Sequence, residues 1–564
     1  MQASKLAERQ TIKKEATATS VAKTLNRDAI LLLLLFVAQA SCFLPICSHI
    51  GFYLDDWLTF WNLHFAPHNF PDLLKASFTD PRMVTRPVQC FYYAATYFLF
   101  GDRPAGYHLL RFSLEYIGAA FLYLGMNRLS SSRFVAALTA LIFILYPSHD
   151  ATHYWIGGAL GPGFGLTLYL ASFCFSVYAF ANKSKTLYAL ALGAFGLSAF
   201  CYESFLPMLV MSFCAILLLA AERRTESRLN TMTSVFWWFV PFLAVGFLEP
   251  IYQRVVLPKV AHVFLSPSST DPFSFFNVFV QGLNVSMFAG MWSFLAQRIR
   301  EELLQFNLLS ALQTFGVLAS ATGIIFVSYG TDQCVRYRRL FTAAILTFFA
   351  SYLTFAVAQG YTPVLDTMIN RVNIGASVAV SMLIALGIKW MIDHTRITGK
   401  TITMMITLPL VLAMVLADLG LSSFWMRSWE VQKNIRFVVA QHADKIEDGD
   451  AILLAGTHRY LNWAPVFDGT WDFQSMLRMT LNRKYVSGGV ICDRLSLKGN
   501  SIQDMSAGFL CADYPCANTK LLFPSESAWV PVNSAAGFVE LASKYKSKFG
   551  VSAATMQRWR AESK

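Results

Sequence analysis

Long apolar segments recur along this chain, and they constrain its fold more than any other feature. A helix that crosses the hydrocarbon core of a bilayer needs about 20 mostly apolar residues. Eleven segments approach or reach this length, the third and the fifth being the shortest: 29–47, 105–126, 134–147, 163–181, 186–201, 205–221, 234–252, 308–328, 340–358, 372–392 and 402–421. We therefore expect an α-helical multi-pass membrane protein with about eleven spans.

The composition agrees with a membrane protein and argues against a nucleic-acid binder. Only 14% of the residues are charged, against about 25% in soluble domains. The formal net charge is +12, but the basic residues stand in short clusters between apolar runs, such as 223–228 and 336–339. A nucleic-acid-binding protein gathers its basic residues on one soluble face, whereas short basic loops are typical of the cytoplasmic side of membrane proteins.

The basic residues also predict an orientation. Residues 1–28 hold six Lys or Arg, so we expect a cytoplasmic N-terminal segment followed by an uncleaved first span. With eleven spans every basic loop faces the cytoplasm. Segment 276–296 is apolar too, but counting it as a span places the 336–339 cluster outside. We therefore interpret 253–305 as an external loop with interfacial helices, in a protein of the cell's inner (plasma) membrane.

This orientation divides the chain into three parts. Residues 29–422 form the membrane domain, whose long external loops are 48–104 and 253–305. Residues 423–564 have no long apolar run, and FVVAQHADKIEDGDAILLAG (437–456) predicts a helix, a polar turn and a buried strand. We expect a small soluble extracytoplasmic α/β domain with a C-terminus outside. Its three cysteines leave one disulfide pairing open: Cys492, Cys511 and Cys516.

Several polar residues fall on the predicted external side, where burial near lipid is costly unless it serves a function. They are Asp55, Asp56, Arg86, His149, His153, Glu203 and Arg371. Asp55 and Asp56 follow the first span directly. A carboxylate there can act as a general base that takes a proton from an attacking hydroxyl. The alternative is that the two acids only cap the start of an interfacial helix.

Four stretches resemble the GT-C superfamily of integral-membrane glycosyltransferases, and among them the bacterial relatives of protein O-mannosyltransferases. They are YLDDW (53–57), TRPVQCFYYAATYFLFGDRPAGYHLLRF (85–112), YPSHDATHYWIGG (146–158) and YESFLP (202–207). The resemblance implies a polyprenyl-phosphate-linked sugar donor, Asp55 as the favoured catalytic base with Asp56 in support, and Arg371 holding the donor phosphate. The sequence departs from the pattern at Tyr202, where a Lys usually precedes the Glu, and no tetratricopeptide repeat follows.

The roles of the remaining residues stay open at this stage. Arg86 either contacts donor phosphate or anchors its loop at the membrane surface. His149 and His153 are four residues apart and could bind substrate or a metal, and Asp56 could contact a divalent cation. Glu203 either pairs with a cation such as Arg371 or caps a helix.

We expect an enzyme, a hexosyl- or pentosyltransferase that acts on a glycan or lipid acceptor with inversion at the anomeric carbon. A polysaccharide or lipid transporter (flippase) is an alternative, but it predicts charged residues in the middle of spans, which the sequence does not suggest. The other alternative is a non-catalytic membrane scaffold.

Overall fold

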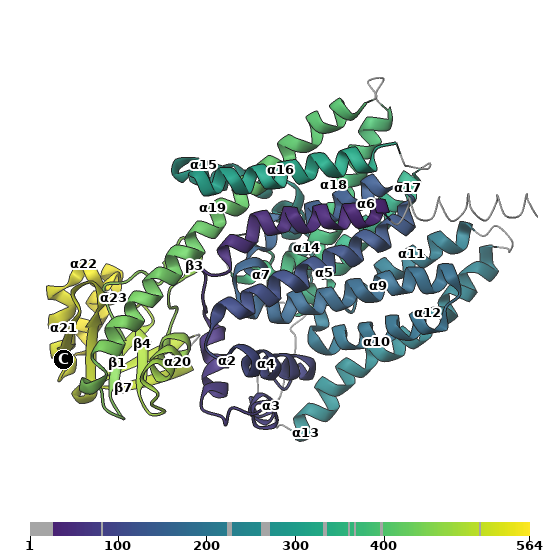
Figure 1. Cartoon of the computed structure of the whole chain (residues 1–564). Helices are drawn as coiled ribbons and strands as arrows, with labels where there is room; N and C mark the ends of the chain where they lie inside the picture. The colour runs from purple at the N-terminus through teal and green to yellow at the C-terminus, as the bar shows by residue number, and fades with distance from the viewer. Residues whose placement is uncertain are drawn as a thin grey trace, which may run out of the picture. The chain divides into compact units, whose positions relative to one another are not determined.

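The computed structural model describes residues 26–563, except 81–82, 223–227, 261–270, 331–334, 359–360, 366–367, 395–398 and 507–508 (Figure 1). Most of the predicted cytoplasmic segment 1–28, the basic residues 223–227 and part of the 253–305 loop lie outside the described residues. The chain forms two compact units. Unit 1 comprises residues up to Pro45, Leu109–His153 and Gly161–Leu421, and unit 2 comprises Ile46–His108, Tyr154–Leu160 and Ser422–Lys564.

The multi-span helical architecture predicted from the sequence is confirmed. By length and composition, ten described helices could cross a membrane, or eleven if a bent pair of helices counts as one span. The ten are Asn26–Ile46, Pro104–Ser130, Ile156–Asn182, Glu203–Glu222, Met232–Val256, Pro272–Gln305, Leu308–Ser328, Tyr337–Ala358, Met368–His394 and Lys400–Gln441.

Three segments differ from the expected spans. The third span, 134–147, is a pair of helices, Arg133–Leu145 and Pro147–Tyr154, bent by 44° where Pro147 interrupts the hydrogen-bond ladder. The fifth is a shorter apolar helix, Lys185–Cys201. Pro272–Gln305, which we assigned to interfacial helices, is long and apolar enough to be a span, although Phe288 breaks it in extended conformation. Length and composition therefore give no reason to separate this segment from the other candidate spans.

Unit 1 is a bundle of apolar helices that pack closely where small residues allow it. A Cβ on Gly316 would lie 2.3 Å from Oγ of Ser41, so the first span and α16 approach through a glycine. The labelled helices of this unit are α6 (Arg133–Leu145), α7 (Asp150–Tyr154), α9 (Phe164–Asn182), α10 (Lys185–Cys201), α11 (Leu209–Glu222), α12 (Arg228–Ile251), α13 (Leu257–Val260), α14 (Pro272–Met287), α15 (Ala289–Gln305), α16 (Leu308–Ser328), α17 (Tyr337–Ala358) and α18 (Ile374–His394). Helices α5 (Pro104–Ser130) and α19 (Lys400–Gln441) each contribute to both units.

Unit 2 contains the helices of the first predicted external loop and the C-terminal α/β region. Its other helices are α2 (Asp55–His64), α3 (Phe70–Thr79), α4 (Pro87–Phe100), α8 (Ile156–Gly158), α20 (Thr470–Leu481), α21 (Ala535–Lys544), α22 (Lys546–Phe549) and α23 (Ala553–Glu562). Pro87 starts α4, where its missing N–H and fixed φ suit a first helical turn. Helix α2 packs against α20, so the loop and the C-terminal region share one unit.

The C-terminal region has an α/β fold built on a mixed sheet of order β4-β1-β8-β9. Strand β1 (Ala451–Leu454) runs parallel to β4 (Ser487–Val490) and β8 (Thr519–Phe523), and β9 (Ala528–Pro531) is antiparallel to β8. The other strands are β2 (Tyr460–Leu461), β3 (Ala464–Pro465), β5 (Leu495–Lys498), β6 (Ser501–Ser506) and β7 (Phe509–Pro515). The predicted helix, polar turn and buried strand over 437–456 are confirmed by the end of α19 and by β1.

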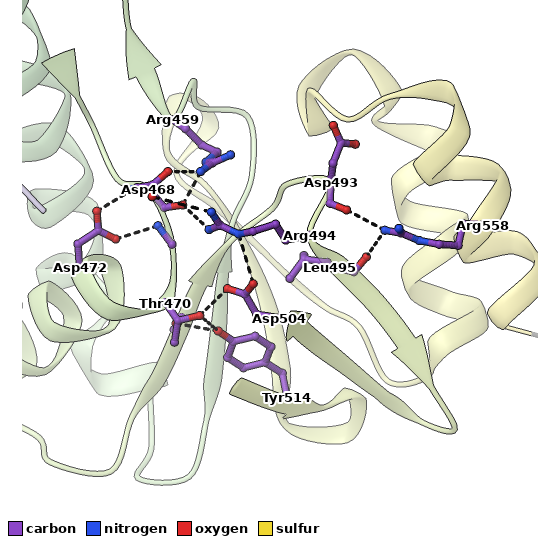
Figure 2. Close-up of polar contacts among 12 residues, drawn as sticks. Arg459, Asp468, Thr470, Asp472, Asp493, Arg494, Leu495, Asp504, Tyr514 and Arg558 are labelled. Carbon is purple, nitrogen blue, oxygen red and sulfur yellow. Dashed lines mark hydrogen bonds and ion pairs between the residues drawn. The ribbon is translucent and has the colours of Figure 1, made fainter. Parts of the chain in front are cut away.

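A charged network follows the parallel strands at their carboxyl ends (Figure 2). Asp468 accepts from Arg459 and, through its backbone carbonyl, from Arg494 at 2.7 Å, and Arg494 lies 3.5 Å from buried Asp504. Asp472 accepts from the backbone N–H of Asp468 at 2.6 Å and so caps α20. The two guanidinium groups and three carboxyl groups link the loops that follow β1 and β4.

The cysteine pairing left open by the sequence is not formed between Cys492 and Cys516. Both are thiols buried in the core cluster of the α/β region. Burial raises the pKa of each thiol above its ordinary value. Both side chains therefore act in this structure as small apolar core residues.

Candidate active site

The predicted acidic pair forms the first turn of α2, directly after a strained backbone position. Leu54 has φ 46° and ψ −116°. A side chain other than glycine at positive φ costs roughly 1–3 kcal/mol, and such strain persists where the surrounding structure enforces it, often at functional sites. The backbone at the acidic pair is therefore held in a specific and costly conformation.

Asp56 is buried and bound by backbone amides. Its side chain is 1% exposed. One carboxylate oxygen accepts from the N–H of Tyr53 at 2.9 Å, and the other accepts from the N–H of Gly157 at 2.7 Å. Burial raises the pKa of Asp56 well above its ordinary value, while the two amide donors act in the opposite direction. Because both oxygens are engaged, Asp56 serves to tie the start of α2 to the 156–158 segment.

Asp55 is the exposed member of the pair. Among the described residues we find no hydrogen-bond donor to its carboxylate. It lies in the first turn of α2, where the partial positive charge of the helix N-terminus stabilises an ionised acid. The Asp55 carboxyl group is thus open to solvent at the start of α2, as the preference for Asp55 over Asp56 as the base requires.

Aromatic side chains hold this turn rigidly. The hydroxyl of Tyr53 donates to the carbonyl of Trp425 at 2.7 Å, and the indole N–H of Trp155 donates to the carbonyl of Tyr53 at 3.0 Å. The indole N–H of Trp57 donates to Gln432 at 3.0 Å. Every donor here is paired within unit 2, so the aromatic residues that flank the acids in the sequence support their geometry.

Arg86 also belongs to unit 2, where it is the residue preceding the first turn of α4. Its side chain is half-buried. Its backbone carbonyl accepts from the N–H of Gln89 at 2.9 Å, which starts the helix. This position agrees with an anchor at the start of α4, and the phosphate contact remains a prediction.

In unit 1, the two predicted histidines belong to a buried polar cluster. His149 and His153 lie with their ring centroids 4.6 Å apart. His153 is 2.6 Å from Glu115, which also accepts from Gln39 at 3.1 Å. Arg111, one helical turn before Glu115, lies 3.5 Å from the same carboxylate. The histidines are thus part of a hydrogen-bonded and ion-paired cluster between helices.

The stretch 146–154 is also tied to the stretch that contains Arg371. The amide of Asn370 donates to Asp150, and its oxygen accepts from the N–H of Ala151 at 3.1 Å. Asn373 donates to the carbonyl of Ser148 at 2.8 Å. The stretch 146–158 singled out in the sequence and the segment that contains Arg371 therefore meet in unit 1.

Arg371 itself is half-buried in the 3-10 helix Met368–Asn373. It donates to the carbonyl of Met368 at 3.3 Å, and its guanidinium carbon is 6.0 Å from the ring centroid of Tyr361. Glu203 is half-buried at the start of the 3-10 helix Glu203–Phe205, and its predicted pairing with a cation remains a prediction.

The predicted site residues thus divide between the two units. Asp55, Asp56 and Arg86 lie in unit 2. His149, His153, Glu203 and Arg371 lie in unit 1. Among the residues that the structure describes, no three or more His, Cys, Asp or Glu side chains are grouped to hold a metal ion. The question of a divalent cation therefore stays open.

Sequence reasoning missed the polar residues inside the apolar helices. Glu115 and Gln39 lie in predicted spans, where each is a single polar residue in an otherwise apolar pattern. The signal that could have found Glu115 is its spacing of four residues from Arg111, which places both on one helix face. Intramembrane charges of this kind are by default functional or structural sites.

Comparison with solved structures finds a distant likeness. No family model and no curated protein match the sequence. Two crystal structures of ArnT from Cupriavidus metallidurans, one bound to undecaprenyl phosphate and one in the apo state, are each 14% identical and cover 83% of this chain and 85% of the ArnT chain, with TM-scores of 0.34 and 0.33.

The resemblance of the sequence to the GT-C superfamily rests on the four stretches named above. The narrower resemblance to protein O-mannosyltransferases remains a prediction. At these TM-scores the likeness adds nothing to the argument for the site or activity of this chain.

Proposed function

We propose that this protein is a membrane glycosyltransferase that moves a sugar from a polyprenyl-phosphate-linked donor to a glycan or lipid acceptor on the extracytoplasmic side. One observation carries the proposal. The fold gives two adjacent acids opposite environments, since Asp56 is buried on two backbone amides and Asp55 is exposed without a described donor. A pair of simple helix caps does not need this division, whereas a general base needs a free carboxylate on a rigid support.

In the proposed reaction the acceptor hydroxyl attacks the anomeric carbon of the donor sugar. The new bond joins the acceptor oxygen to that carbon, and the bond from the carbon to the phosphate oxygen breaks. The electron pair leaves with the lipid phosphate, and the hydroxyl proton passes to Asp55. Attack opposite the leaving group inverts the anomeric configuration.

The cationic side chains are assigned to the donor. Arg371 is proposed to contact the lipid phosphate, because a guanidinium can donate two parallel hydrogen bonds to phosphate oxygens. Charge grows on that phosphate as the bond breaks, so such a contact is stronger in the transition state than in the ground state. Arg86 is proposed as a second phosphate contact. Glu203, His149 and His153 are proposed to line the substrate site, and a metal contact by Asp56 is left to experiment.

One observation favours the alternative of a transporter or flippase. We expected spans almost free of ionised residues, yet Arg111 and Glu115 lie within the candidate span Pro104–Ser130 and are buried or nearly so. Both residues stand in the first half of that helix and pair with each other, which is also the pattern of a structural ion pair near a helix end. The transferase proposal therefore stays ahead of this alternative.

The two functions differ in what accumulates when the protein is absent. We compare a strain that lacks the protein with the same strain carrying it, by mass spectrometry of polyprenyl lipids and of envelope glycans. The transferase proposal predicts loss of a hexose- or pentose-sized mass from one envelope glycan or lipid and accumulation of a polyprenyl-phosphate monosaccharide. Accumulation of a completed lipid-linked glycan would instead support transport, and unchanged profiles would support a scaffold.

A further inference from the structure

A cavity of about 320 Å³ lies in unit 1 where α9 ends and α10 begins, against α12. Small-molecule sites in proteins typically have volumes of about 300–1,000 Å³, so this cavity can hold a compact polar group. The side chains that define its chemistry are Phe180, Lys183, Ser184, Lys185, Tyr188 and Trp238.

Two lysines give the cavity a positive charge. Lys183 and Lys185 are both exposed. Neither side chain takes part in any ion pair with a described residue. Lys183 occupies the left-handed region, with φ 53°, and ends α9. Two ammonium groups two residues apart, without a carboxylate partner, favour an anionic ligand.

The aromatic wall of the cavity is already ordered. The hydroxyl of Tyr188 donates to the backbone carbonyl of Trp238 at 2.8 Å, and the two rings meet edge-on with centroids 4.7 Å apart. Trp238 also stacks on Phe242 at 5.3 Å with an interplanar angle of 17°. Tyr and Trp concentrate at the level of lipid headgroups, where one side of the ring meets acyl chains and the other meets water.

We propose that this cavity binds the phosphate headgroup of an anionic phospholipid. The lysine ammonium groups would attract the negatively charged phosphate, and the aromatic rings would pack against the glycerol and the upper part of the acyl chains. Basic pockets between membrane helices on the cytoplasmic side are suited to anionic headgroups. The sequence predicts that Lys183 and Lys185 face the cytoplasm, so the lipid comes from the inner leaflet. This inference does not depend on the proposed catalytic activity.

The substitutions are chosen to remove charge with little effect on the backbone. Lys183→Asn suits the left-handed φ, which Asn tolerates best after glycine, and Lys185→Gln keeps the length of a polar chain. The conservative variant is Lys183→Arg with Lys185→Arg. The matched control is Arg338→Gln with Arg339→Gln, which removes two exposed cations at the start of α17. Thermal melting of each purified full-length variant shows that it is folded.

The assay is native mass spectrometry of the full-length protein titrated with phosphatidylglycerol, with phosphatidylcholine or with inorganic phosphate. Each lysine near a headgroup contributes roughly 1 kcal/mol, so we expect the Asn/Gln double variant to bind phosphatidylglycerol about 30-fold more weakly, a difference of about 2 kcal/mol. The Arg pair and the α17 control should bind it like wild type.

Three results would overturn the proposal. One is equal binding of phosphatidylglycerol to wild type and to a folded Asn/Gln variant. Another is binding of inorganic phosphate as tight as that of the lipid, which would make the cavity a site for a soluble anion. Equal affinity for phosphatidylcholine and phosphatidylglycerol would also contradict it, because the charge would then have no role.

Discussion

Removing the carboxylate of Asp56 should destabilise the protein far more than removing that of Asp55. In Asp56→Ala the N–H groups of Tyr53 and Gly157 lose their acceptor in a buried site. An unsatisfied buried donor costs about 1–3 kcal/mol, so the expected loss is about 2–6 kcal/mol. Asp55→Ala removes an exposed group and should change stability by less than about 0.5 kcal/mol.

The assay is thermal and denaturant unfolding of the purified full-length variants in detergent, followed by tryptophan fluorescence. The Trp57 and Trp155 side chains lie in the same unit as Asp56, so local unfolding changes the signal. Asp56→Asn serves as an intermediate case, because its amide oxygen keeps one of the two N–H bonds. Equal unfolding midpoints for the Asp56→Ala and Asp55→Ala proteins would refute the assigned difference between the two acids.

Three other perturbations test the packing and charge of the structure. Gly51→Ala should lower the melting temperature, because a Cβ would lie 2.0 Å from the ring of Trp429 and overpacking costs about 1–3 kcal/mol; a variant as stable as wild type contradicts this contact. The pKa of His64 is raised chiefly by its hydrogen bond to Asp102. The stability that this pair contributes is therefore full below the ordinary His pKa of 6.5 and is lost as the pH rises through the raised pKa. The melting temperature of His64→Gln should not show this decrease with pH. Glu115→Gln should cost about 3–5 kcal/mol, because it leaves buried Arg111 without its carboxylate, and normal yield and melting would argue against this ion pair.

The helical fold could be predicted from the sequence because hydrocarbon thickness sets the length of each apolar run. Which runs cross a membrane could not be predicted as well. The segment 272–305 has the hydropathy of a span but is broken at Phe288, and Pro147 bends the third run. The bend at 147 follows from a proline that hydropathy does not weigh, and hydropathy gives no sign of the break at Phe288.

The candidate site was predictable in residue type and only partly in arrangement. The adjacent acids at 55 and 56 are visible in the sequence, but their opposite environments follow from Gly157, a residue 101 positions from Asp56. The link of Asn370 to Ala151 spans 219 positions. Glu115 was hidden in a span, where a single acid looks like an interruption of an apolar pattern.

The central claim is that Asp55 is the catalytic base, and it is tested most directly in intact cells. Wild type, Asp55→Asn and Asp72→Asn are compared by mass spectrometry of cell-surface glycans and glycolipids, with protein level and melting temperature measured for each. Asp72 is a matched control, since it is also an acid in the first turn of a helix of unit 2. The proposal predicts that Asp55→Asn alone loses a hexose- or pentose-sized addition while remaining folded. A surface profile identical to wild type in folded Asp55→Asn cells would contradict it.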